Sequence, residues 1–423
     1  MKTTDVVIVG AGVARLVAGR ELAKAGKKVV MLEARDRVGG RVWPIAEEEF
    51  GFQVQAGAEF VHGPAPITKS LIKEAGLTYI PTEEGERWNT YSGKLTKEEE
   101  LFDKKVLHDK LRELKEDVPI AIFFEKYFPE EKYSATRKAI IEQVKNYDAA
   151  DPYKISTFSL RDEWLGDEKW QQGKIKEGYG PLLDFLKSEC VKNAVEINFN
   201  QEVKSVEIDG EIVSVLCSDG KRYESEKVLI TLPLPVLAQI NFNPPVPEKM
   251  AAASKIGFGS VIKILLLFKD RFWVNASEND LDKLLFLRSS EEVPIWWTQY
   301  PELNPLFTGW IAGPRAEELK NTSFDEILNF ALTSLSNIFK IDPSILKNGL
   351  LKSRVVNWPS DLFALGAYSY STVGAPKAYE ELRKPIGDKI FFAGEALFNG
   401  KETATVEGAL VSGLEMAKKM LNN

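Results

Sequence analysis

With 423 residues, of which 44% are hydrophobic, the chain is long enough to bury the cores of roughly two or three domains. Its formal net charge of −7 leaves no strongly basic surface, so we expect no nucleic-acid partner. Only two cysteines and two histidines occur, and they do not cluster, so the composition predicts no disulfide framework, no metal site and a reducing, cytoplasmic location.

The chain also has no segment of the kind that enters a membrane. No apolar run approaches the ~18 residues of a spanning helix, and the first predicted strand starts almost at the initiator methionine. We therefore expect neither a signal peptide nor a membrane anchor, and no membrane partner.

The N-terminal residues have the pattern of a dinucleotide-binding unit. Residues 5–9 form an apolar run typical of a buried strand, Gly10 and Gly12 form a tight turn, and residues 15–25 favour a helix. In such a unit the N–H groups at the helix start bind a pyrophosphate, and the glycines let it approach without a Cβ in the way. The sequence therefore predicts a Rossmann-like nucleotide site.

Two further positions bear on this site: Glu33 supports it, and Arg15 departs from the usual pattern. Glu33 follows a second apolar run, residues 29–32, about 20 residues after the glycine turn. A carboxylate there accepts hydrogen bonds from the adenosine ribose and repels a 2′-phosphate, so NADP is not the expected nucleotide. Arg15 occupies the place of the third small residue, which normally lets helix and strand pack closely. We expect its side chain to strain that packing or to turn outwards, and the nucleotide to bind more weakly than with glycine.

The rest of the chain alternates between helical and strand-like segments. Residues from about 67 to 189 are rich in Lys, Glu, Leu and Ile at helical spacing, and predict a helical insertion. Short alternating strands with Asp-Gly turns follow at residues 195–234, and residues 261–268 enter a second sheet. Residues 389–394 form an apolar strand, and residues 405–421 form a final helix. The aromatic-rich stretches that suit the floor of a substrate pocket are residues 294–313 and 355–370.

Six segments in this order resemble one family over nearly the whole chain. They are residues 5–41, Gly57–Gly63, Ser260–Lys263, Gly366–Tyr370, Phe392–Glu395 and Ala404–Ala409. The chain resembles the FAD-binding flavin amine oxidases, which include monoamine oxidases, polyamine oxidases and lysine-specific histone demethylases, and it is most similar to the polyamine oxidases. The resemblance implies an α/β fold with a Rossmann-like FAD-binding domain of the GR2 flavoprotein type and a mixed-sheet plus helical substrate-binding domain.

The resemblance also implies a domain division and a cofactor. Residues 1–66, 195–255 and 385–423 would form a discontinuous FAD-binding domain, and residues 67–194, largely helical, and 256–384 would form the substrate-binding domain. FAD would be noncovalent, because no cysteine follows Cys217 and the C-terminal thioether of monoamine oxidases cannot form. The residues expected to hold it are Gly10, Gly12, Glu33, Arg35, Gly40, Arg41, Ala58, Glu59, Val203, Trp358, Gly394, Glu395, Thr405 and Val406.

Three of these residues have specific roles implied by the family. Glu395 would hold the ribityl chain, although a plain turn at a strand end is the alternative. Val203 would contact adenine through its backbone. Val406 would supply a backbone N–H to the flavin at the start of the last helix, where the positive end of the helix dipole stabilises charge on the reduced ring.

The expected catalytic residues are Lys263, Tyr368 and His62. Lys263 stands in an apolar strand, and the matching lysine of the family holds a water near flavin N5; an edge strand that faces water is the alternative. Tyr368 would form an aromatic wall beside the flavin, unless it is a core residue. Thr405 stands where other members place the opposing aromatic residue, so the two-walled cage is incomplete, and Trp358 is the candidate to complete it.

The expected substrate contacts are His62, Glu59, Asp151 and Tyr368. His62 matches the histidine that faces the substrate amine in animal polyamine oxidases, against the alternative of a structural histidine. Asp151 lies in a segment similar to one that carries an acidic substrate contact in plant polyamine oxidases, against the alternative of a helix cap. Carboxylates spaced along a tunnel are what a chain of ammonium groups needs.

The predicted function is that of an FAD-dependent amine oxidase with a small-molecule amine substrate. It would remove a hydride from the carbon beside a neutral amine nitrogen of a polyamine or related amine, deliver it to flavin N5 and leave an imine that water hydrolyses. O2 would reoxidise the flavin and give H2O2. The alternatives are an oxidase or desaturase of another substrate on the same fold, such as an amino acid, a monoamine or a hydrocarbon, and a catalytically impaired FAD-binding protein. The scissile C–N bond, the oligomeric state and the physiological electron acceptor stay open.

Overall fold

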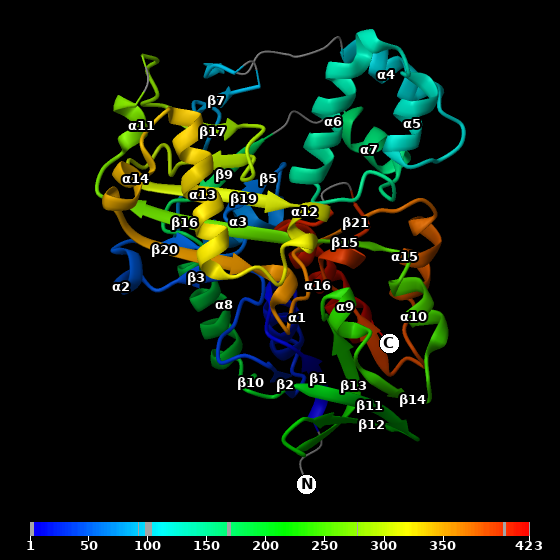
Figure 1. Cartoon of the computed structure of the whole chain (residues 1–423). Coiled ribbons are helices and arrows are strands. Elements are labelled where there is room, and N and C mark those ends of the chain that lie inside the picture. Colours follow the sequence, from blue (N-terminus) through cyan, green and yellow to red (C-terminus); the bar gives the residue numbers. More distant parts are fainter. Residues whose placement is uncertain are drawn as a thin grey trace.

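The computed structural model describes residues 4–91, 93–97, 104–166, 171–276, 278–400 and 403–422. Within these residues, two large sheets lie one above the other, with a group of helices beside the upper sheet (Figure 1). Because the chain enters the lower sheet from several separate segments, residues far apart in sequence meet between the two sheets.

The lower sheet contains eight strands in the part of the chain described. In spatial order they are β10 (Glu196–Asn198), β2 (Val29–Leu32), β1 (Thr4–Val9), β13 (Arg222–Ile230), β12 (Ile212–Cys217), β11 (Val203–Asp209) and β14 (Asn241–Asn243), with β22 (Ile390–Phe392) paired to β13. The strands β10, β2, β1, β13 and β22 pair in parallel. Burial on both faces explains the continuous apolar runs at residues 6–9 and 29–32.

Helices cover both faces of this sheet. Those on one face are α1 (Val13–Lys24), α8 (Gly180–Lys192) and α16 (Val406–Asn422), and those on the other are α9 (Leu234–Leu237), α10 (Pro247–Ala253) and α15 (Ala375–Arg383). Helix α16 packs closely on α1 because Gly413 has no side chain, and a Cβ there would overlap the carbonyl of Ala14. The N-terminal and C-terminal segments are therefore neighbours in the core.

The upper sheet contains seven strands among the described residues. In order they are β20 (Leu350–Asn357), β16 (Val261–Phe268), β19 (Leu306–Ala312), β18 (Ile295–Trp297), β17 (Leu284–Arg288), β7 (Glu86–Asn89) and β8 (Thr96–Lys97). Its outer face is covered by a second core that includes α11 (Phe272–Asn275), α12 (Pro314–Glu318), α13 (Phe324–Phe339) and α14 (Pro343–Gly349). Helix α13 starts at a capping box between Ser323 and Glu326, which satisfies its first N–H groups.

Shorter elements complete the walls between the two sheets. A helical cluster, coloured cyan in Figure 1, consists of α4 (Lys104–Glu113), α5 (Ile120–Tyr127), η1 (Glu131–Tyr133), α6 (Ser134–Asn146) and α7 (Thr157–Trp164). The small sheets and remaining helices are β3 (Pro44–Ile45) with β4 (Val54–Gln55), β5 (Phe60–His62) with β9 (Gln172–Ile175) and β6 (Tyr79–Pro81), β15 (Gly257–Gly259) with β21 (Tyr368–Tyr370), and α2 (Glu47–Phe50), α3 (Pro66–Glu74), η2 (Trp358–Ser360) and η3 (Glu395–Leu397).

The strands of the lower sheet all come from the three segments 1–66, 195–255 and 385–423. Helix α8 lies in the expected helical insertion but packs into the core of the lower sheet through Leu183 and Leu186, so the insertion does not form one unit. In the described part of the chain, no helix combines the length and the apolar character needed to cross a bilayer.

Candidate active site

A cavity of about 540 Å³ is lined by residues of both large sheets, by the start of α16 and by the helical cluster. This volume lies within the range of ~300–1,000 Å³ found for small-molecule sites. Its lining includes every cofactor, catalytic and substrate residue predicted from the sequence except Asp151. The fold therefore brings together residues from both ends of the chain.

One end of the cavity is the predicted nucleotide site. Gly10 has φ +100°, a conformation that favours glycine, and helix α1 begins after Gly12 with no side chain capping its first N–H groups. A Cβ added to Gly12 would lie in ordinary van der Waals contact with the Arg15 guanidinium and the Gly39 carbonyl, at 3.8 Å each. Glu33 accepts hydrogen bonds from the backbone N–H of Ala11 (2.6 Å) and Arg35 (3.0 Å), which fix its carboxylate at the end of β2.

Arg15 turns inwards rather than outwards. Its side chain is buried, and its guanidinium donates to both the hydroxyl and the backbone carbonyl of Thr231, at the end of β13. The guanidinium also lies 3.8 Å from the carboxylate of Glu33, and it crowds the space where a side chain on Gly10 would be. Burial lowers the pKa of Arg15 to about 10, against the attraction of Glu33. The residues at this end fit a dinucleotide except at Arg15, which lines the cavity.

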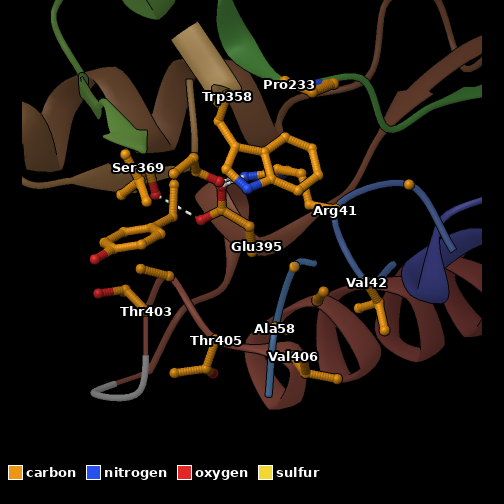
Figure 2. A pocket seen from close by; sticks show the side chains of 18 of the residues that line it. Arg41, Val42, Ala58, Pro233, Trp358, Ser369, Glu395, Thr403, Thr405 and Val406 are labelled. Atoms are coloured by element: carbon orange, nitrogen blue, oxygen red, sulfur yellow. Dashed lines mark hydrogen bonds and ion pairs between the residues drawn. The ribbon is translucent and has the colours of Figure 1, made fainter. Parts of the chain in front are cut away.

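The middle of the cavity is organised around Glu395. Figure 2 shows its carboxylate joined to Arg41 and to Ser369, at 2.7 Å in each case. Arg41 also donates to the backbone carbonyl of Ala367 at 2.6 Å. Because both carboxylate oxygens are engaged, this network ties strand β21 to η3 and to Arg41 beneath Trp358, and it holds the side chains in one arrangement.

Helix α16 begins on the side of the cavity away from Trp358 (Figure 2). The hydroxyl of Thr405 accepts a hydrogen bond from the N–H of Gly408 at 3.0 Å, so Thr405 is the N-cap of this helix. Capping gives a physical reason for threonine at this position, where other members of the resembled family carry an aromatic residue. Val406 follows as the first helical residue and lines the cavity.

A contact that the sequence analysis missed links α16 to α3. The buried carboxylate of Glu407 accepts hydrogen bonds from the backbone N–H of Ile67 (2.9 Å) and from the N–H and hydroxyl of Thr68 (2.7 and 2.6 Å). Helix α3 has no side-chain cap of its own, so Glu407 caps it from across the fold. No local sequence signal identifies such a cap, because the two helices are more than 300 residues apart.

Lys263 lies in the middle of the upper sheet and not at its edge. Strand β16 pairs with β19 on one side and β20 on the other, and the Lys263 side chain is fully buried. Its ammonium donates to the carboxylate of Glu59 at 2.8 Å and to the carbonyl of Gly57 at 3.2 Å. Burial would raise the pKa of Glu59, but Lys263 and Lys174 lower it to about 2. Burial lowers the pKa of Lys263, and Glu59 opposes this effect.

His62 and Tyr368 line the far end of the cavity. Burial and the charge of Arg87 lower the pKa of His62 to about 4, so the imidazole is neutral at pH 7. The phenol of Tyr368 donates to the backbone carbonyl of Tyr147 at 2.8 Å, which fixes the ring on the cavity wall. The edge of the Tyr147 ring faces the His62 ring, with 6.2 Å between their centroids.

The carboxyl group that residues 147–152 contribute to the cavity belongs to Asp148 and not to the expected Asp151. The carboxylate of Asp151 accepts from the N–H of Tyr153 and pairs with Lys154, and Asp151 does not line the cavity. Asp148 lines it instead, together with Glu163 from α7. Glu163 is exposed as a residue, but the protein atoms around its carboxyl group desolvate it and raise its pKa to about 7. Burial together with Glu163 raises the pKa of Asp148. The local pattern identified the segment, but only packing decides which carboxylate faces the cavity.

The chain matches known proteins over almost its full length. The family model described as flavin containing amine oxidoreductase matches residues 14–421. The chain is 29% identical to lysine-specific histone demethylase 2 of Homo sapiens over 455 residues, which cover 98% of this chain and 53% of the demethylase. It is 28% identical to polyamine oxidase 2 of Arabidopsis thaliana over 457 residues, which cover 99% of this chain and 88% of the oxidase. It thus spans about half the length of the demethylase relatives.

Solved structures share its fold. A wild-type putrescine oxidase bound to putrescine has a TM-score of 0.82 at 20% identity, with 99% of each chain covered. Cyclohexylamine oxidase from Brevibacterium oxydans has a TM-score of 0.81 at 19% identity, again with 99% of each chain covered. The predicted α/β fold class is confirmed.

Proposed function

Because the chain belongs to the flavin-containing amine oxidoreductase family, we propose that it is an FAD-dependent amine-oxidising enzyme whose substrate is a polyamine or a related amine. The observation that supports this most directly is the single cavity described above. It connects a dinucleotide-binding turn at Gly10 with a chamber lined by His62, Asp148 and Tyr368. An aromatic wall, a neutral imidazole and carboxyl groups are the set that a molecule with several amine nitrogens needs.

Apart from Arg15, the residues at the glycine turn fit FAD. Backbone N–H groups at the start of α1 would hold its pyrophosphate, Glu33 its adenosine ribose, and the first turn of α16 its isoalloxazine ring. When bound, FAD accepts a hydride at N5 and passes the electrons to O2, which yields H2O2. We propose that it is held noncovalently, in the domain formed by residues 1–66, 195–255 and 385–423.

The task of the protein is to bind the amine in the correct protonation state and orientation. His62 is neutral at pH 7, so its ring can accept or donate a hydrogen bond to an amine nitrogen without repelling an adjacent ammonium group. Tyr368 presents its ring to the cavity from a position fixed by its hydrogen bond to Tyr147. These contacts would place the carbon beside a neutral nitrogen against the ring system, and the buried walls would exclude water.

Asp148 and Glu163 provide the acidic contacts in this proposal. Desolvation raises the pKa of both carboxyl groups, so it opposes their ionised forms when no counter-ion is near. A bound ammonium group would favour their ionised forms, and this interaction would select a substrate with a second positive charge. The same feature would disfavour an apolar substrate such as a hydrocarbon.

Peroxide release on a panel of amines tests the proposal. The panel contains putrescine, spermidine, spermine, acetylated polyamines, monoamines and amino acids, and uses protein loaded with FAD. Turnover of the polyamines with a higher kcat/KM than of the monoamines supports the proposal. Turnover confined to amino acids or monoamines overturns it, and a protein that binds FAD but oxidises no compound of the panel is a catalytically impaired FAD-binding protein.

A further inference from the structure

Glu59 is surrounded by four hydrogen-bond or ion-pair partners inside the protein. Its Oε2 accepts from Lys263 (2.8 Å) and from the indole N–H of Trp297 (3.0 Å). Its Oε1 pairs with Lys174 at 3.0 Å and accepts from the Gln299 amide at 3.3 Å. A carboxylate has about four lone-pair sites, so its accepting capacity is filled. Glu59 therefore cannot bind a substrate ammonium group unless it gives up one of these partners.

The fold brings this cluster together from two sheets. Phe60, which follows Glu59, pairs with Lys174 across the small sheet, so the two charged side chains start from adjacent strands. Lys263 and Trp297 project from one face of the upper sheet: Lys263 pairs with Trp310, and Trp310 pairs with Ile295, two residues before Trp297. The Lys263 ammonium lies 5.2 Å from the Trp297 ring centroid, which adds a cation–π contact.

The cluster carries one negative and two positive groups, all of them buried. Burial of an unpaired ammonium is costly, so the single carboxylate is shared between Lys263 and Lys174. Lys263 directs two of its three N–H groups to Glu59 and Gly57. These two bonds fix the direction of the third N–H, and Lys263 lines the cavity.

We infer that Glu59 and Lys174 are positioning residues for Lys263, and that together they give this wall of the cavity a net positive charge. The inference rests on the proposed function for its consequence: a protonated amine is repelled from this wall, a neutral nitrogen approaches it, and the remaining ammonium groups of a polyamine are directed to Asp148 and Glu163. Glu59 thus acts through Lys263 and not as a direct substrate contact.

The protonation of Lys263 in two variants tests the inference without turnover. Glu59 and Lys174 are the charged groups that act on Lys263. Lys174→Met leaves Lys263 as the only lysine paired with Glu59, so the pKa of Lys263 should rise. Glu59→Gln leaves Lys263 and Lys174 without this counter-ion, so the pKa of Lys263 should fall. Each change is expected to be about 1–3 pH units. The measurement is an NMR titration of FAD-free protein that carries isotope-labelled lysine, with the Lys263 signal assigned from Lys263→Met.

A matched control is Lys97→Met, because Lys97 also pairs with a glutamate, Glu86, but is exposed and does not line the cavity. This variant should leave the Lys263 signal unchanged. Opposite shifts in Lys174→Met and Glu59→Gln support the inference, and shifts in the same direction, or none, overturn it. If Glu59→Gln does not fold, a pKa that fails to rise in Lys174→Met is sufficient to reject it.

A second measurement connects the cluster to the reaction. The pH profile of kcat in loaded enzyme should have an alkaline limb that moves up in Lys174→Met by the same amount as the NMR titration. If the pKa of Lys263 shifts as expected in Lys174→Met but the enzyme oxidises no amine, the proposed function is wrong and this inference stands. If the enzyme oxidises polyamines but the pKa of Lys263 does not change in Lys174→Met, this inference is wrong and the proposed function stands.

Discussion

The guanidinium of Arg15 and the end of strand β13 are joined by two hydrogen bonds, one to the hydroxyl and one to the carbonyl of Thr231. This contact places a bulky cation at a helix position where dinucleotide-binding folds usually have a small residue. The cation lies within the cavity lining and beside the carboxylate of Glu33, which we expect to bind the ribose. We therefore expect Arg15 to compete with FAD for space and for Glu33.

Replacement of Arg15 by glycine should tighten FAD binding. Overpacking costs about 1–3 kcal/mol, so its relief corresponds to roughly a 5- to 150-fold decrease in the Kd for FAD. The measurement is a fluorescence titration of the FAD-free protein with FAD. Arg20→Ala is the control, because Arg20 is a buried arginine of the same helix that does not line the cavity. Equal FAD affinity in wild type and Arg15→Gly would contradict the prediction.

Removal of the Glu407 carboxylate should destabilise the fold rather than alter catalysis directly. Glu407→Ala leaves two N–H groups and one hydroxyl of helix α3 without their acceptor, at a cost of about 3 kcal/mol. Urea unfolding of the FAD-free protein measures this as a lower midpoint with an unchanged slope. Glu415→Ala, on the exposed face of the same helix, should leave the midpoint nearly unchanged. Similar losses in both variants would show that the cap is unimportant.

The sequence predicts those parts of the fold whose signals are local. The apolar runs at residues 5–9 and 29–32 predict the strands β1 and β2, and the pattern at 405–421 predicts α16 within one residue at each end. These elements are read from hydrophobic periodicity and from glycine positions, which depend little on the rest of the chain. Helix α8 shows the limit of this approach, because periodicity identifies a helix but not the sheet on which it packs.

The candidate site depends more strongly on distant contacts. The sequence marks Lys263 as unusual, but the partners of Glu59 come from strands more than 100 residues away. The choice between Asp148 and Asp151 depends on the direction of each side chain after a helix end, which a three-residue spacing does not determine. Side-chain partners that come from different sheets could not be predicted from one sequence.

If FAD binds as proposed, replacement of Lys263 by methionine should slow the reaction of the flavin by about 100-fold or more, because it removes a fixed charge from the cavity wall. Stopped-flow absorbance measures flavin reduction by amine and reoxidation by O2 separately. Lys249→Met is the control: Lys249 is also buried and pairs with Glu381, but it lies outside the cavity. Rates close to wild type in both half-reactions of Lys263→Met would remove Lys263 from the mechanism.

The affinity for a cationic substrate should depend on pH through Glu163. Its carboxyl group faces the cavity, and the surrounding walls raise its pKa to about 7, above the ordinary value of 4.5. Below pH 7 the group is protonated and neutral, so it must release a proton before it pairs with an ammonium group. Binding of spermidine should therefore strengthen as the pH rises from 6 to 8, and it should be accompanied by proton release.

Calorimetry in two buffers of different ionisation enthalpy measures that release directly. Glu163→Gln should abolish most of it, and it should also unfold at a higher urea concentration than wild type at pH 8. The sign follows from linkage: a carboxyl group whose pKa is raised by folding opposes folding when it is ionised. This advantage should shrink as the pH falls and disappear well below the ordinary glutamate pKa of 4.5, where both the folded and the unfolded wild type hold the proton. Proton release that persists unchanged in the variant would assign the linkage to another group, with Asp148 as the next carboxyl to replace.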